Sequence, residues 1–329
     1  MDSRRTFVKK LGKSAVLSSL ALSSISDYVT KQQYSKLNGQ KAMRIGIIGA
    51  ENSHSIEYGK IFNTEKKFPG FEVGYIWGET EEFARRAMKE GNIPDMVRDP
   101  SEMMGKIDAL IVDHRHPKYH LPAAEPFVQA GIPTFIDKPF CYRLSEGKAF
   151  LSMARKAGTP VTSYSMIAQS NATYDIKEQL ISIGEFSHII SCGPADLESV
   201  YGGIFFYGIH IIQPLVMMFG NDIKKVRVTR NAKTAGASLV YGNGKLATLV
   251  FKNESGGWET FVDTKEGLTK LQSRIPEPDP GKNYADMVEM FRTGNEPVSD
   301  MDILGPIAVL EALEKSAVSD NWEEVPSFD

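Results

Sequence analysis

Between Lys41 and Tyr164 the sequence alternates short apolar runs with amphipathic stretches, and this alternation constrains the fold most. The runs with the composition of buried parallel strands are 43–49, 71–77, 107–112, 133–136 and 161–164. The stretches with helical spacing of apolar residues are 79–90, 120–130 and 144–157. Strands that alternate with helices form βαβ units and therefore a parallel sheet. Residues 41–165 are thus predicted to form a Rossmann-type α/β domain.

After Tyr164 the pattern changes to a series of strands with turn signals between them. The candidate strands are 186–192, 225–229, 238–241, 247–251 and 258–262. The sequence Tyr-Gly-Asn-Gly-Lys at 241–245 is typical of a hairpin turn. Two helices near 284–293 and 303–316 complete the chain. Residues 166–329 are therefore predicted to form an α+β domain for substrate binding and oligomerisation, on a mainly antiparallel sheet.

The first 40 residues differ in kind from the rest of the chain. Arg4 and Arg5 precede Phe7, and residues 11–25 are rich in Ala, Leu and Ser and contain no acidic residue. This arrangement resembles a twin-arginine export signal, followed by a polar linker up to residue 40. The alternative is an amphipathic surface helix with an incidental arginine pair, in which case the protein would stay in the cytoplasm. The signal interpretation predicts export of the folded protein, with the signal and linker occupying residues 1–40.

The overall composition excludes some classes of partner. The formal net charge is −3, whereas a general nucleic-acid binder usually has an excess of basic residues. No apolar run approaches the ~20 residues that a membrane-spanning helix needs. Cys141 and Cys192 have no metal-ligand spacing and can pair only if the fold brings them together.

The turn after the first strand reads Gly-Ala-Glu-Asn-Ser-His from Gly49 to His54. A dinucleotide-binding turn carries glycine at the first, third and sixth of these positions. Here Glu51 and His54 replace the second and third glycines, and a carboxylate at Glu51 repels a pyrophosphate. Two interpretations therefore remain: a cofactor-binding turn in which Gly49, Ala50, Glu51 and Asn52 lie near the pyrophosphate, or a turn that binds no nucleotide.

The segment Ile-Asp-Lys-Pro, which ends at Pro139, follows the fourth candidate strand. With the preceding Ala-Gly-Ile-Pro-Thr-Phe it resembles the glucose–fructose oxidoreductase / inositol dehydrogenase / MocA family, and the likeness extends over 43–163. It implies that Lys138 lies beside a nicotinamide and hydrogen-bonds the substrate hydroxyl, with Asp137 in place of the usual Glu. His120 is similar to the family's histidine before this strand, so His120, Asp137 and Pro139 are expected near the cofactor. The position alone points Lys138 into the ligand crevice, although a surface lysine is the alternative.

Residues 201–213 resemble the family's helix in the second domain. On that resemblance His210 is the catalytic histidine, which accepts the hydroxyl proton. Phe206 and Gln213 stand where the family has aspartates, and the Tyr207 hydroxyl is a candidate substitute. The alternative is that His210 is a hydrogen-bonded core residue.

Other polar residues at the strand ends carry weaker signals. Glu79 follows the second strand, where a carboxylate binds the ribose of NAD and disfavours NADP. The Asp-His-Arg-His sequence at 113–116 suggests a substrate or metal site. Because no carboxylate with matching spacing accompanies His114 and His116, no metal site is predicted. Tyr164 and Gln169 are expected to line the cleft between the domains.

These features predict an NAD(P)-dependent oxidoreductase with tightly held NAD or NADP that acts on a sugar, polyol or related carbonyl compound. Lys138 would position the reacting oxygen and His210 would exchange its proton. One alternative is a glycoside-cleaving enzyme of the same fold that uses NAD transiently. The other is a non-catalytic sugar-binding protein on a degenerate scaffold, which Glu51, His54 and Phe206 suggest. Relatives associate through the second domain's sheet, so a homo-oligomer is also expected.

Overall fold

The computed structural model describes residues 42–231, 234–252 and 257–327. The predicted export signal and linker, residues 1–40, lie outside this part of the chain. Among the described helices, none has the length and apolar character needed to cross a membrane.

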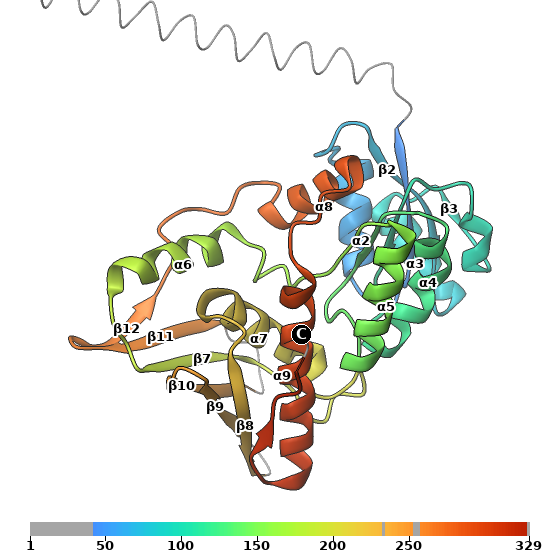
Figure 1. Cartoon of the computed structure of the whole chain (residues 1–329). Coiled ribbons are helices and arrows are strands. Elements are labelled where there is room, and N and C mark those ends of the chain that lie inside the picture. Colours follow the sequence, from blue (N-terminus) through green and yellow to red (C-terminus); the bar gives the residue numbers. More distant parts are fainter. Residues whose placement is uncertain (1–41, 232–233, 253–256, 328–329) are drawn as a thin grey trace, which may run out of the picture.

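The first domain is built on a parallel sheet of six strands in the order β3-β2-β1-β4-β5-β6 (Figure 1). The strands are β1 (Met43–Ile48), β2 (Phe71–Trp77), β3 (Asp95–Met96), β4 (Ala109–Val112), β5 (Thr134–Ile136) and β6 (Val161–Thr162). Because the chain leaves β1 first toward β2 and later returns to β4, the order reverses between β1 and β4, where open α/β sheets bind ligands. The predicted Rossmann-type sheet is confirmed. Strand β3 is an addition, since two residues are too few to show a period.

Helices cover both faces of this sheet. They are α2 (His54–Gly59), which continues as a π-helical turn at Lys60–Thr64, α3 (Glu81–Gly91), α4 (His120–Gln129) and α5 (Leu144–Ala157). Residues of α2 and α3 share one core cluster with β1 and β2, whereas α4 and α5 pack with β4 on the opposite face. All four residues of β4 are buried, as expected for a strand covered on both sides.

Helix α3 begins at Glu81, two residues later than the apolar spacing predicted. The Thr80 hydroxyl accepts a hydrogen bond from the Phe83 amide and so caps the helix. Glu79 is therefore a loop residue, and its carboxylate is free to turn back toward the end of β1.

The second domain contains a mixed sheet of seven strands in the order β12-β11-β7-β10-β9-β8-β13. The strands are β7 (His188–Pro194), β8 (Ile223–Arg230), β9 (Ala235–Tyr241), β10 (Leu246–Lys252), β11 (Glu259–Thr264), β12 (Gly267–Leu271) and β13 (Glu323–Glu324). Strands β7 and β10 are parallel and the other neighbours are antiparallel. The hairpin predicted at 241–245 joins β9 to β10, and the Tyr241 amide donates to the Lys245 carbonyl. The mainly antiparallel sheet is thus confirmed.

The helices of the C-terminal half are α6 (Asn171–Ile183), α7 (Phe205–Phe219), α8 (Lys282–Thr293) and α9 (Asp300–Ser319). The strand pattern did not indicate α6. Helix α8 lies against the first domain, where Met287, Val288 and Phe291 join the core cluster of β1 and β2 (Figure 1). The apolar face of α8 therefore covers part of the first domain, although α8 lies after the predicted domain boundary at residue 165.

The two cysteines do not pair. Cys141 is buried in the first domain and Cys192 lies in β7, and both are free thiols.

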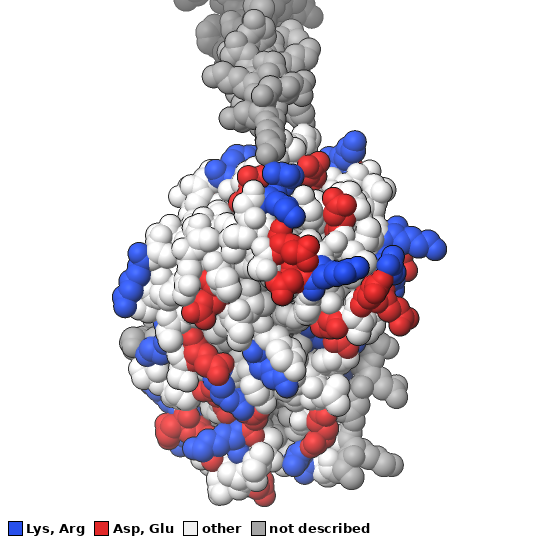
Figure 2. All heavy atoms as spheres, turned by 90° about the vertical axis from the view of Figure 1, so that its right-hand side faces the viewer, with Lys and Arg blue, Asp and Glu red and all other residues white. Residues whose placement is uncertain are grey.

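Basic and acidic side chains are interspersed over the face of the molecule that Figure 2 shows. This mixture accords with the small net charge of −3.

Candidate active site

Lys138 lies directly after β5, at the carboxyl end of the parallel sheet. Its ammonium nitrogen is 3.6 Å from Asp137 Oδ2 and 5.6 Å from the centre of the Phe206 ring, which belongs to α7. Only 6% of the side chain is exposed, so the alternative of a surface lysine is wrong. The peptide bond between Lys138 and Pro139 is cis.

His210 of α7 lies close enough to Lys138 for the lysine charge to affect its pKa. Its Nδ1 is 2.6 Å from Ser165 Oγ, and the Ser165 amide donates to Gln213 Oε1 at 2.6 Å. Burial, followed by the positive charge of Lys138, lowers the pKa of His210 well below 6.5. The imidazole is therefore neutral at neutral pH and able to accept a proton. Its Nε2 has no hydrogen-bond partner among the described residues.

Aromatic rings lie at and next to the first of the two positions where the sequence lacks an aspartate. The Phe206 ring lies near Lys138 and is 5.3 Å from the guanidinium carbon of Arg115. Tyr207 is 40% exposed, and its ring centre is 6.2 Å from that of His210. Phe206 thus keeps contact with the lysine through its ring face, and Tyr207 borders the histidine.

Gly49 ends β1 with a φ of +112°, which favours glycine. A Cβ atom there would lie 2.6 Å from the carbonyl carbon of Asp113. The glycine is therefore required by the close approach of the loop after β4.

The amides of Ala50 and Glu51 are occupied by a side chain of the same domain. Both donate to Glu79 Oε2 at 2.9 Å, and Glu79 Oε1 lies 2.7 Å from His114 Nδ1. Burial opposes ionisation of Glu79, but these hydrogen bonds outweigh it and lower its pKa to about 2. Glu79 therefore holds a full negative charge at the turn. His116 has a different partner, the Lys118 amide, so the two histidines at 114 and 116 do not share a site.

Three ionisable side chains meet at the carboxyl ends of β1, β4 and β5. His54 Nδ1 lies 3.2 Å from Asp137 Oδ2 and 3.8 Å from Asp113 Oδ1, and Asn52 Nδ2 donates to Asp113 Oδ1 at 2.9 Å. Neither aspartate has any exposed surface. We call His54, Asp113 and Asp137 the His-Asp-Asp cluster.

Each ionisable group of the His-Asp-Asp cluster changes the pKa of the others. Burial lowers the pKa of His54, but the charge and hydrogen bond of Asp137 outweigh this and raise it to about 9. Burial also favours the neutral form of Asp137, but the positive charges of His54 and Lys138 outweigh it and lower its pKa. The pKa of Asp113 is raised, first by burial and then by the neighbouring Asp137. The charged form of Asp137 is therefore favoured, whereas the neutral form of Asp113 is favoured.

His120 is completely buried, and both its ring nitrogens contact backbone carbonyls. Nδ1 lies 2.8 Å from the Pro139 oxygen and Nε2 lies 2.8 Å from the His114 oxygen. The ring thus joins the loops that follow β4 and β5. It has no free nitrogen for the expected cofactor contact and acts on the site by fixing these loops.

A polar contact joins the first turn to the second domain. Tyr201 donates to Glu51 Oε1 at 2.6 Å, and Arg115 Nη1 donates to the Tyr201 hydroxyl at 3.0 Å. The Arg115 guanidinium carbon also lies 4.3 Å from the Tyr201 ring centre. Glu51, which replaces a glycine of the fingerprint, is therefore a domain-bridging residue.

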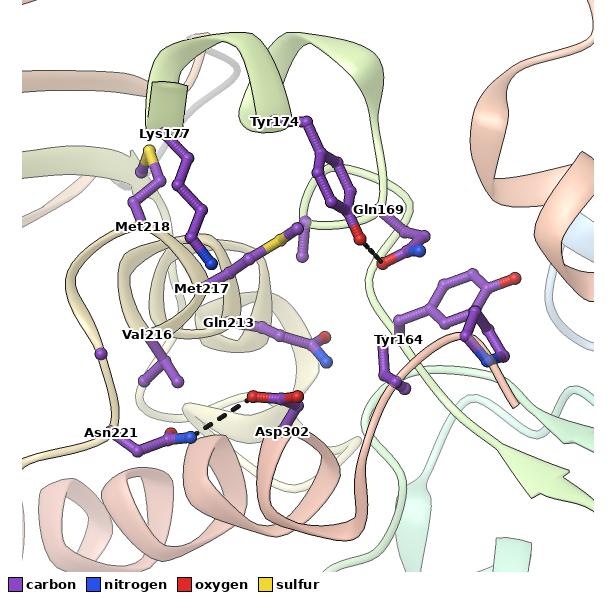
Figure 3. A pocket seen from close by; sticks show the side chains of 14 residues that line it. Tyr164, Gln169, Tyr174, Lys177, Gln213, Val216, Met217, Met218, Asn221 and Asp302 are labelled. Carbon is purple, nitrogen blue, oxygen red and sulfur yellow. Dashed lines mark hydrogen bonds between the residues drawn. The ribbon is translucent and has the colours of Figure 1, made fainter. Parts of the chain in front are cut away.

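A cavity of about 310 Å³ lies beside the site, between α6, α7 and the start of α9. Lys177 of α6 and Gln213 of α7 point into it (Figure 3). Tyr164 and Gln169, expected in the cleft between the domains, line this cavity. Because Gln213 also binds the Ser165 amide, the cavity borders the residues that hold His210.

Sequence motifs identified part of this site. Lys138 and His210 lie close enough for the lysine charge to lower the pKa of the histidine, and Tyr207 borders His210. The contributions of Ser165 and Tyr201 were missed, because neither lies in a motif. The pairing of Asp113 with His54 depends on the neighbouring positions of β1 and β4, which no local pattern specifies.

The residues at this edge fit a nicotinamide dinucleotide in their chemistry. Glu79 is ionised and follows β2, where such folds hold a ribose, and its Oε1 has a further lone pair for a hydroxyl. Lys138 and His210 supply a buried cation and a neutral base at the reacting end. Glu51 adds a carboxylate near the turn, which opposes a pyrophosphate.

Residues 43–165 match the family of oxidoreductases with an NAD-binding Rossmann fold known as Gfo/Idh/MocA. No curated protein sequence matches the chain at a significant level.

Several solved structures share the fold over nearly their whole length. Myo-inositol dehydrogenase from Lactobacillus casei, in complex with NAD(H) and myo-inositol, has a TM-score of 0.73 at 13% identity, over 87% of this chain and 97% of that one. Scyllo-inositol dehydrogenase from the same organism, with NAD(H) and scyllo-inositol, has a TM-score of 0.71 at 17% identity, over 87% and 100%. GenD2 from gentamicin A biosynthesis, in complex with NAD, has a TM-score of 0.73 at 13% identity, over 88% and 97%. The family match covers the N-terminal domain, residues 43–165, and the likeness to these solved structures shows that the chain shares their fold.

Proposed function

We propose that this protein is an NAD(P)-dependent oxidoreductase that acts on a sugar, polyol or related carbonyl compound and keeps its cofactor tightly bound. The observation that carries the proposal is the pairing of Lys138 and His210. One is a buried ammonium group and the other a buried, neutral imidazole, and they come from different domains. A hydride transfer from an alcohol needs both groups, one to hold the oxygen and one to remove its proton.

The two side chains have distinct roles in this reaction. Lys138 donates a hydrogen bond to the reacting oxygen and stabilises negative charge on it. In the proposed reaction the neutral His210 ring carries its proton on Nδ1, and this N–H group donates a hydrogen bond to Ser165 Oγ. Nε2 is then free to accept the proton of the substrate hydroxyl. When bound, the nicotinamide accepts the hydride from the carbon that bears this hydroxyl. In the reverse direction His210 returns the proton to the oxygen.

Cyclic polyols are the first substrates to test, because two structural neighbours are inositol dehydrogenases. The rings of Phe206, Tyr207 and Trp258 lie near Lys138 or His210 and offer apolar faces to the C–H groups of such a ring.

The test begins with the purified full chain. Absorbance and mass spectrometry measure co-purified nicotinamide, and turnover is followed with inositols and a panel of sugars. Lys138→Met should keep the cofactor but lower kcat by about 100-fold or more, whereas the exposed Lys156→Met control should match the wild type. Full turnover in Lys138→Met would contradict the assigned role. A protein that contains no cofactor and binds no added NAD or NADP would instead be a non-catalytic binding protein, and release of an aglycone without net NADH would indicate glycoside cleavage.

We also propose that residues 1–40 direct export, on the strength of Arg4, Arg5 and the apolar stretch that follows. Folded export would allow the cofactor to be loaded beforehand. Cell fractionation tests this, since changing both arginines to lysine should retain the protein in the cytoplasm. A homo-oligomer is proposed on the family resemblance alone, and light scattering measures it.

A further inference from the structure

The His-Asp-Asp cluster has the donor atoms and the spacing of a metal site. His54 Nδ1 and one carboxylate oxygen from each aspartate all lie within 4.8 Å of one another. The distances from Nδ1 to the two oxygens are 3.2 and 3.8 Å. Ligands bound to one zinc ion at about 2.0–2.2 Å are separated by about 3.3–3.6 Å in a tetrahedron. The two distances from Nδ1 therefore lie within a few tenths of an ångström of those in a zinc site, and the two oxygens lie no more than 4.8 Å apart.

The two aspartates are incompletely satisfied by the protein. Both are fully buried, and Asp113 Oδ2 and Asp137 Oδ1 have no hydrogen-bond partner among the described residues. Burying a carboxylate is costly unless the charge is paired and its oxygens are hydrogen-bonded. Asp113 Oδ2 and Asp137 Oδ1 are the partners of the two oxygens nearest His54, so each carboxylate in the cluster keeps a buried oxygen that the protein does not hydrogen-bond and has unused capacity to bind a ligand.

We propose that His54, Asp113 and Asp137 bind one divalent cation of the Zn²⁺ or Mn²⁺ class. One imidazole nitrogen and two carboxylates form a donor set that suits these ions. Asn52 supplies a fourth position, because its Nδ2 lies 2.9 Å from Asp113 Oδ1 and 3.4 Å from each of the other two ligand atoms. Rotation of this amide by half a turn places Oδ1 toward the cation.

A proton on His54 is the competing occupant of this position. An Nδ1–H group reaches Asp137 Oδ2 at 3.2 Å, but Asp113 Oδ1 at 3.8 Å is beyond hydrogen-bond distance. A proton therefore pairs with one carboxylate, whereas a dication pairs with both. A cation binds here only when His54 gives up this proton.

The inference does not rest on the proposed reaction, yet it explains two departures from the family pattern. His54 stands at the third glycine of the fingerprint and Asp137 replaces the usual Glu, and both belong to this one cluster. A bound dication would also offset the negative charge that Glu51 presents to a pyrophosphate.

The test uses the full chain with a tag that contains no histidines, stripped with EDTA and free of nicotinamide. The protein is titrated with MnCl₂ and ZnCl₂, and uptake is measured by electron paramagnetic resonance of free Mn²⁺ and by elemental analysis after desalting. We expect about one ion per chain and a higher thermal midpoint in the presence of metal. His54→Ala and Asp113→Asn should each weaken binding by at least about 10-fold.

His188→Ala is the matched control, because His188 lies in β7 and contacts Thr248, away from the cluster. It should bind metal like the wild type. Thermal midpoints without metal show whether each variant is folded, and Asp113→Asn retains the shape of the side chain. The proposal is overturned if the wild type takes up no ion at 1 mM metal, or if both cluster variants bind as tightly as the wild type. Since no nicotinamide is present, neither result bears on the proposed oxidoreductase.

Discussion

Ser165 illustrates how a residue outside any motif controls the candidate base. It lies just beyond β6, in the segment where the chain enters the second domain, and its hydroxyl lies 2.6 Å from His210 Nδ1. Its amide is fixed by Gln213, one turn further along α7 than His210. The hydroxyl therefore orients the imidazole ring of His210.

Ser165→Ala should lower kcat by about 10-fold, because losing a net hydrogen bond of ~1.4 kcal/mol changes a rate by that factor. The KM for substrate should change little, since Ser165 acts through His210. Ser165→Thr retains the hydroxyl and should restore most of the rate. Steady-state kinetics on the three proteins measure this, and equal kcat values for Ala and Ser would show that the contact does not position the base.

The same scale shows what the sequence could and could not predict about the site. Lys138 and His210 could be identified because each lies in a short segment that still resembles the family's motif although neighbouring residues differ. The His-Asp-Asp cluster was not assembled, since Asp113 and His54 are 59 positions apart and meet only through the parallel pairing of β1 with β4. The metal position thus depends on strand order rather than on local spacing.

At the scale of elements, the end of β1 is the most constrained point of the first domain. Gly49 combines a φ of +112° with backbone atoms of the β4 loop that lie less than 3 Å from the place a Cβ atom would occupy. Gly131, after α4, has a similar φ of +81° but nothing within 4 Å. Substituting each of these two glycines therefore distinguishes the free-energy cost of a positive φ, present at both, from the cost of a steric clash, present only at Gly49.

Gly49→Ala should lower the free energy of unfolding by about 3 kcal/mol or more, because a strained backbone and an overpacked contact add together. Gly131→Ala should cost about 1 kcal/mol, which is the conformational part alone. Urea unfolding of both variants gives the two numbers. Equal losses would mean that the loop after β4 moves aside without cost.

Helices and strands were predicted well where the apolar periodicity was strong. They were predicted less well where a capping side chain set the end of a helix or where long-range packing set its position. Helix α5 has the predicted bounds, whereas α3 starts at Glu81 because the Thr80 side chain caps it. Helix α8 was predicted as a helix, but its place on the first domain follows from Met287 and Phe291 meeting the β1 and β2 core. Such long-range packing leaves no local signature.

At the scale of the whole molecule, buried ionisable groups tie the loops of the first domain together. Glu79 joins the first turn to His114, and His120 joins the loops after β4 and β5. In the folded state hydrogen bonds lower the pKa of Glu79 to about 2 against the opposing effect of burial, and burial lowers that of His120 to about 4. Both groups therefore bind fewer protons in the folded protein than in the unfolded chain.

The stability that His120 and Glu79 contribute should be fully present above about pH 6.5 and should decrease as the pH falls. The His120 contribution is lost between about pH 6.5 and 4, and the Glu79 contribution between about pH 4.5 and 2, each roughly 3 kcal/mol at ~1.4 kcal/mol per pKa unit. This loss is measured as a decrease in the midpoint of urea unfolding from pH 7.5 to 5.5, to 4 and to lower pH. Glu79→Gln should lower the midpoint at pH 7.5 and flatten the pH dependence below 4.5, whereas the exposed Glu82→Gln control should do neither. If Glu79→Gln keeps the wild-type pH dependence, another carboxylate controls the acid response, and the hydrogen bonds from Ala50 and Glu51 do not hold the first turn in solution.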